Sequence, residues 1–134
     1  MYLFVVACVL VVGVLAFVRL APTNAARGQQ PIAETNSQNM LGGAIRVTDV
    51  EPEALARVDA AARDLPRTRA IAGSVEDGRI TYETRSKWIG FPDYTTVEHS
   101  DGLLKMYARL RFGRSDFGVN RERLERLLVA AQQG

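Results

Sequence analysis

Polar and apolar residues alternate along residues 103–112, which is the clearest structural pattern in the chain. Successive side chains of a strand point to opposite faces of its sheet. One face would therefore carry Leu104, Met106, Ala108, Leu110 and Phe112, and the other Lys105, Tyr107, Arg109 and Arg111. Such alternation is typical of an antiparallel sheet that packs one face and exposes the other to water.

Other segments supply the remaining elements of this expected domain. Further strands are predicted at residues 44–47, around Ile71, and at residues 79–85 and 94–99. Helical spacing of Leu55, Val58, Ala62 and Leu65 predicts a helix between Pro52 and Pro66, and Leu124, Leu127, Leu128 and Ala131 predict another that opens near Asn120. The pattern indicates an α+β fold, an antiparallel sheet of four or five strands packed on one face by two helices.

A long apolar segment opens the chain. Residues 2–18 are all apolar or glycine, and the run continues past Arg19, whose alkyl stem can place its charge at a membrane interface. Small residues at 24–26 would suit a cleaved signal peptide, but the basic start of such a peptide is missing. A lipoprotein signal ending at Cys8 would be very short. We expect a retained transmembrane anchor over residues 1–21.

Residues 22–43 are rich in Gln, Asn, Ala, Gly and Pro without apolar periodicity, so we expect a linker there and the α+β domain over residues 44–134.

Arg19 and Arg27 flank the apolar segment and favour a cytoplasmic domain. A chain that begins directly with its apolar segment more often exports the part that follows. We favour the periplasmic side of a bacterial cytoplasmic (inner) membrane.

Charge and residue inventory exclude several classes of function. All 15 acidic residues and 15 of the 17 basic ones follow residue 30, so the domain is formally neutral and unlike a general nucleic-acid binder. His99 is the only histidine, and its neighbours Ser100 and Asp101 cannot adopt the geometry of a catalytic triad within one tight turn. We predict no catalytic residue, no metal site and no cofactor.

Two groups of residues are candidates for ligand binding. On the polar sheet face, four cations either form solvated ion pairs with Glu83 and Glu98 or line a groove for an acidic ligand: Arg85, Lys105, Arg109 and Arg111. In the loop before the last helix, capping side chains either start the helix or leave its amides, with nearby arginines, to bind an anion. The candidate ligand-binding residues are Arg85, Asp93, Arg109, Arg111, Ser115, Asp116, Asn120 and Arg121.

Three blocks carry a family resemblance. Arg85-Ser86 followed by Gly90-Phe91-Pro92-Asp93, the strand end at residues 109–112, and the segment Gly113-Arg114-Ser115-Asp116-Phe117-Gly118-Val119-Asn120-Arg121-Glu122-Arg123 resemble the bacterial family DUF1499. The chain departs from the family where many members carry Pro-Asn-Cys and this sequence reads Ser37-Gln38-Asn39-Met40. The resemblance implies a shared fold and no particular activity.

Because the resemblance implies no activity, the expected function is inferred from the architecture of the chain. A short anchor with a compact domain suits a non-catalytic accessory or binding subunit of a larger integral membrane complex, with membrane lipid as a further partner. The alternative is a ligand-binding or enzymatic domain that recognises an anionic small molecule through its arginine-rich sheet face.

Overall fold

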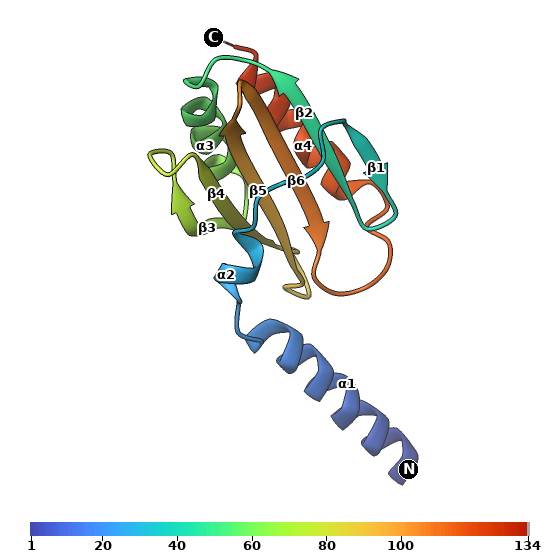
Figure 1. Cartoon of the computed structure of the whole chain (residues 1–134). Coiled ribbons are helices and arrows are strands. Elements are labelled where there is room, and N and C mark those ends of the chain that lie inside the picture. The colour runs from blue at the N-terminus through green and yellow to red at the C-terminus, as the bar shows by residue number, and fades with distance from the viewer. Residues whose placement is uncertain (134) are drawn as a thin grey trace.

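The structure is a computed structural model that describes residues 1–133, apart from the side chain of Arg27. An apolar helix projects from a domain in which two helices pack against one sheet (Figure 1). In chain order the elements are α1 (Tyr2–Leu20), α2 (Ala25–Gly28), β1 (Gln38–Met40), β2 (Gly43–Asp49), α3 (Ala54–Asp64), β3 (Thr68–Ser74), β4 (Arg79–Arg85), β5 (Pro92–Ser100), β6 (Leu103–Leu110) and α4 (Val119–Ala131).

The α+β fold is confirmed, and the expected number of strands is wrong. Within residues 1–133 the antiparallel sheet has six strands in the order β1-β2-β6-β5-β4-β3. The additional strand is β1, which pairs with β2 from Gln38 opposite Ile45 to Met40 opposite Gly43. All three residues of β1 are exposed, so the strand has no buried face and leaves no apolar alternation in the sequence.

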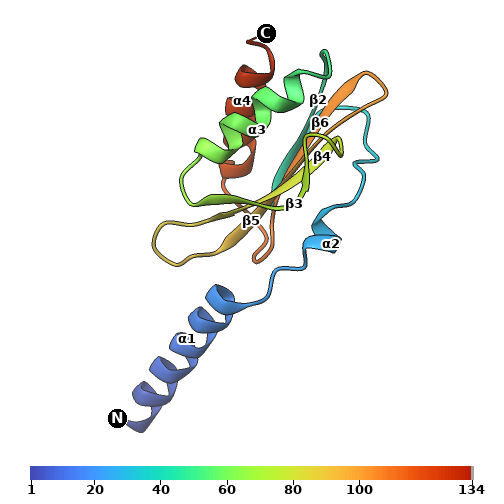
Figure 2. The same cartoon turned by 90° about the vertical axis from the view of Figure 1, so that its left-hand side faces the viewer.

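Helices α3 and α4 cover one face of the sheet, as Figure 2 shows. Strand β6 contributes Leu104, Met106 and Ala108 to the core, each fully buried. The helices meet these side chains with residues that include Leu55, Val58, Leu124 and Leu127. The alternation along β6 thus predicted the core face correctly, although the strand ends at Leu110 rather than Phe112.

The centre of the second face of the sheet is also buried, so the expectation that this face is open to water is wrong there. Residues 22–33, which we call the strap, run across this face on the side opposite α3 and α4 (Figure 2). Beneath the strap, Thr81, Glu83, Thr96 and Glu98 are each no more than 2% exposed. The polar side chains of this face therefore bond to a covering segment instead of to water.

Backbone groups of the strap bind the sheet at two points. The Gly28 carbonyl accepts hydrogen bonds from Thr96 Oγ1 at 2.9 Å and from Arg109 Nη2 at 3.2 Å. The Ile32 N–H donates to Glu98 Oε1 at 2.7 Å, and the Ile32 carbonyl accepts from Lys105 Nζ at 3.1 Å. Buried backbone polar groups need such partners, so a polar sheet face suits a strap whose only regular structure is the short helix α2.

Replacement of Glu98 by Ala is expected to lower the free energy of unfolding by about 3 kcal/mol. The change leaves the Ile32 N–H without its acceptor and the guanidinium of Arg79, 2.8 Å from Glu98 Oε2, without its partner. Thermal unfolding of the full chain in neutral detergent measures the loss. Glu76→Ala, at an exposed acid of the β3–β4 turn, is the control; equal unfolding temperatures for the two variants would contradict the role of Glu98.

Candidate functional site

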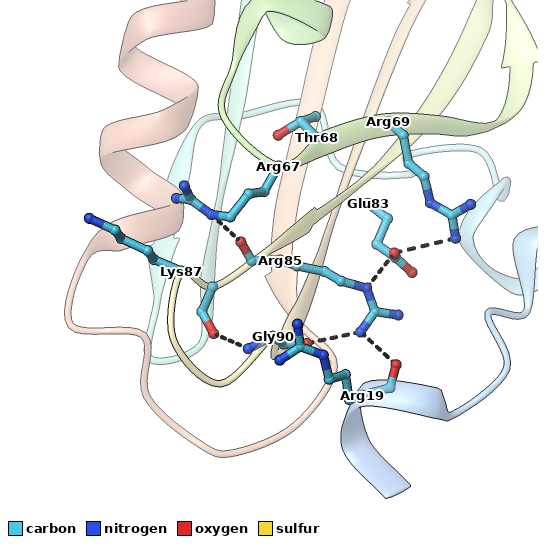
Figure 3. A pocket seen from close by; sticks show the side chains of 9 residues that line it. Arg19, Arg67, Thr68, Arg69, Glu83, Arg85, Lys87 and Gly90 are labelled. Atoms are coloured by element: carbon cyan, nitrogen blue, oxygen red, sulfur yellow. Dashed lines mark hydrogen bonds and ion pairs between the residues drawn. The ribbon is translucent and has the colours of Figure 1, made fainter. Parts of the chain in front are cut away.

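A cation-rich pocket lies where α1 meets the domain (Figure 3). It has a volume of about 440 Å³, and we call it the basic pocket. Its lining contains five cationic side chains and one carboxylate among the described residues: Arg19, Arg67, Arg69, Arg85 and Lys87, with Glu83. The excess of positive charge makes it the strongest candidate for an anion-binding site in the described part of the chain.

Several elements bring these side chains together. Arg69 of β3 and Glu83 of β4 stand directly opposite each other in the sheet register, so their side chains share one face. Arg85 ends β4, and Arg19 lies in the last turn of α1. Residues that are far apart in the sequence therefore build one pocket, which no local spacing could indicate.

Glu83 is the anionic centre of the pocket and is already neutralised. Its Oε2 accepts from the Thr23 hydroxyl of the strap at 2.5 Å, and its Oε1 accepts from Arg85 Nε at 2.9 Å. Arg69 Nη2 lies 3.4 Å from Oε1. Burial acts to raise the pKa of Glu83, but the hydrogen bonds from Thr23 and Arg85 and the nearby guanidinium charges hold it below its usual value.

Arg85 joins the end of α1 to the β4–β5 loop. Its Nη1 donates to the carbonyl of Arg19 at 3.1 Å and to the carbonyl of Gly90 at 2.9 Å. The last carbonyls of a helix have no partner within the helix and carry partial negative charge, so a guanidinium there stabilises the helix end. Arg85 thus has a structural role in positioning α1.

Arg19 and Lys87 have no acidic partner among the described residues. The side chain of Arg19 passes over Gly90, where an added Cβ would lie 3.6 Å from Arg19 Cγ; the φ of +79° at Gly90 also favours glycine. Lys87 Nζ lies 4.9 Å from the ring centre of Trp88. Arg69 adds a side chain that is 67% exposed and close to only one carboxylate. These three cations can turn toward an incoming anion.

Neither Arg109 of β6 nor Arg111, which follows the end of this strand, lines the basic pocket. Arg109 lies beneath the strap, bonded to Gly28 and Thr96 and stacked 4.7 Å from the ring of Tyr107; burial lowers its pKa. Arg111 donates to the Tyr94 hydroxyl at 3.2 Å. Both instead line a separate pocket of about 270 Å³ beside the strap, so the predicted arginine face is divided.

The loop before α4 mainly caps the helix. Asp116 accepts from the N–H of Gly118 at 3.0 Å and from the N–H of Asn120 at 2.9 Å, so two of the amides proposed to bind an anion are occupied. Ser115 Oγ accepts from the Phe117 N–H at 3.3 Å. Ser115, Asp116 and Arg121 line a pocket of about 240 Å³ that also includes residues of β1 and its turn.

Asp93 forms a second polar centre, on the helix-covered side of the sheet. Its Oδ2 accepts from Asn120 Nδ2 at 3.3 Å and lies 3.7 Å from Arg123 Nη1. Burial raises the pKa of Asp93, although Arg123 and Asn120 act in the opposite direction. Asp93 and Asp116 line one pocket of about 380 Å³ together with Arg85 and Arg123. Of the eight predicted residues, Arg85 alone lines both this pocket and the basic one.

Sequence reasoning missed most of the basic pocket. Arg67, Arg69 and Lys87 were not among the candidates, and Arg19 entered only as a flank of the apolar segment. The one signal in the sequence was the pair Arg67 and Arg69 around the start of β3. It indicates a pocket only once the strand register places Arg69 opposite Glu83.

The fold and the basic pocket together describe an α+β domain of one six-stranded sheet, preceded by a single apolar helix. The profile of the family described as "Protein of unknown function (DUF1499)" matches residues 22–130. The chain therefore belongs to the DUF1499 family, as the resemblance predicted, and the match includes the strap. No curated protein matches the chain.

Glu83→Gln is expected to lower the free energy of unfolding by about 2 kcal/mol at pH 7, because charged hydrogen bonds from Thr23 and Arg85 are weakened. The folded-state pKa of Glu83 lies below the unfolded value of about 4.3, so its contribution is present above that pH. It is lost as the pH falls through the lowered pKa. The unfolding temperatures of both full chains in neutral detergent should therefore converge as the pH falls below about 4.3.

The exposed acid Glu76 provides the control, since Glu76→Gln should leave the unfolding temperature nearly unchanged across the same range. A difference between wild type and Glu83→Gln that stays constant or grows on acidification would contradict the assignment.

Proposed function

We propose that this protein is a membrane-anchored, non-catalytic binding module that holds an anionic group, such as a phosphate, in the basic pocket at the membrane surface. The observation that supports the proposal is the position of five cationic side chains around one neutralised carboxylate at the end of α1. Helix α1 has the length and apolarity of a membrane span, criteria that a signal sequence also meets. If α1 is retained in the membrane, Arg19 lies at the interface.

The bonding of the polar side chains favours binding over catalysis. Nε2 of His99 lies 2.7 Å from the Val50 carbonyl, and Asp116 caps α4. Glu98 is held by Arg79 and the strap. Ser86 Oγ accepts from the N–H groups of Gly90 and Phe91, which fixes the β4–β5 loop. Each of these groups has a structural partner.

Three finer expectations belong to the same proposal. The accessory-subunit role predicts a large membrane protein that co-purifies in mild detergent, and a free monomer would count against it. The bacterial inner membrane as location and the periplasmic side for the domain also stay predictions. Protease accessibility of the domain in spheroplasts compared with inverted vesicles would decide between the two sides.

Retention of α1 predicts a thiol in the mature protein, because Cys8 is the only cysteine of the chain and lies in α1. Protein isolated from membranes, denatured and treated with N-ethylmaleimide, should gain one adduct on a full-length mass. A chain without a thiol would show that α1 is a cleaved signal. A chain that begins at an acylated Cys8 would show lipidation.

Anion binding predicts that phosphate raises the unfolding temperature of the full chain in neutral detergent, relative to chloride at equal ionic strength. The double variant Arg19→Gln, Lys87→Gln removes two cations that have no acidic partner, and we expect its affinity for phosphate to fall by about tenfold or more, the equivalent of 1.4 kcal/mol.

The matched control is Arg63→Gln, Arg126→Gln, which removes two positive charges from surface pairs with Asp59 and Glu122; neither arginine lines the basic pocket. It should keep the response to phosphate. Equal loss of the response in both double variants would show a general charge effect and would contradict a specific site.

A further inference from the structure

The basic pocket adjoins a second pocket of different chemistry. This second pocket, which we call the apolar pocket, has a volume of about 380 Å³. Four apolar side chains line it: Phe91, Leu110, Phe117 and Val119. It shares Arg67, Arg85 and Ser86 with the basic pocket, so these residues form a common rim.

The two carboxylates in the apolar pocket, Asp93 and Asp116, already have hydrogen-bond partners. Asp93 is bonded to Asn120 and close to Arg123, and Asp116 accepts backbone N–H groups of the α4 start. What remains for a ligand is largely the apolar surface. Phe117 is 95% exposed, Val119 49% and Phe91 37%, an unusual exposure for adjacent large apolar side chains.

Both pockets lie at the end of the domain that faces α1. Figure 1 and Figure 2 place the β4–β5 loop and the β6–α4 loop at this end. Phe17 of α1 packs edge-on against Phe112 of the β6–α4 loop, with 6.4 Å between ring centres. Trp88 of the β4–β5 loop is 83% exposed, and tryptophan favours the membrane–water interface.

Acidic glycerophospholipids join an anionic phosphodiester to apolar acyl chains through a glycerol unit, and a retained α1 would hold both pockets at a surface made of such lipids. We infer that the two pockets form one site for an acidic glycerophospholipid, with its phosphodiester among the cations of the basic pocket and an acyl chain against Phe91 and Phe117. This inference rests on the proposed function, since it requires the retained anchor and the anion-binding pocket. A free phosphate ester would supply the charge but would leave the apolar pocket uncovered.

Native mass spectrometry of the full chain in neutral detergent tests the inference with phosphatidylglycerol and phosphatidylcholine at equal amounts. We expect at least fivefold more phosphatidylglycerol adduct. Glycerophosphoglycerol, which is the same headgroup without acyl chains, should bind at least tenfold more weakly than phosphatidylglycerol and should compete with it.

Two double variants separate the parts of the site. Phe91→Ser, Phe117→Ser should reduce the phosphatidylglycerol adduct at least fivefold and leave binding of glycerophosphoglycerol unchanged. Arg19→Gln, Lys87→Gln should reduce both. The controls are Val129→Ser, at an exposed position of α4, and Arg63→Gln, Arg126→Gln; all variants are compared only where their unfolding temperatures show a folded chain.

The outcomes distinguish the two levels of the proposal. Glycerophosphoglycerol binding that depends on Arg19 and Lys87, with no effect of the phenylalanine changes on phosphatidylglycerol, would overturn the lipid inference and leave the anion site standing. Equal adducts of the two phospholipids would also overturn it. If neither phosphatidylglycerol nor its headgroup binds, the proposed function itself fails.

Discussion

The structure depends on two carboxylates that are buried on a face of the sheet where water was expected. Glu83 and Glu98 are each at most 2% exposed, and a buried charge is tolerated only when its oxygens are fully bonded. Arginines of β4 supply part of the bonding, and the strap supplies the rest through Thr23 and the N–H of Ile32. The strap and the polar sheet face therefore require each other.

This requirement also positions the apolar helix. The strap follows α1 directly, and Arg85 links the last turn of α1 to both Glu83 and the β4–β5 loop. The guanidinium of Arg85 thus neutralises the buried Glu83 and also holds the end of α1, which fixes the direction in which α1 leaves the domain. The cations of the basic pocket surround this junction, so the site and the anchor share one structural origin.

Two groups of cations differ in their partners, one bonded to the strap at the centre of the sheet and one around the basic pocket at its end. The candidate site for an anion therefore lies at the end of the sheet. Arg109 is bonded to the Gly28 carbonyl of the strap, and Lys105 is bonded to the Ile32 carbonyl, so the strap engages both cations. Arg19 and Lys87 have no acidic partner among the described residues. Positive charge without a fixed acidic partner is what attracts an anion, and among the described residues such charge gathers in the basic pocket beside α1.

The sequence by itself determined the apolar helix, five of the six strands, both covering helices and the family. Buried residues such as Leu104, Met106 and Leu124 recur at the spacing of one strand or helix face, so the local pattern of apolar residues predicts these elements. It also predicted that Asp116 could cap α4. Only the tertiary structure decided what lies over the polar face of β4, β5 and β6, because a strap bonded through its backbone has no apolar pattern. The basic pocket likewise arises from strand register and chain direction, which bring Arg19 to Arg85 across 66 positions of sequence separation.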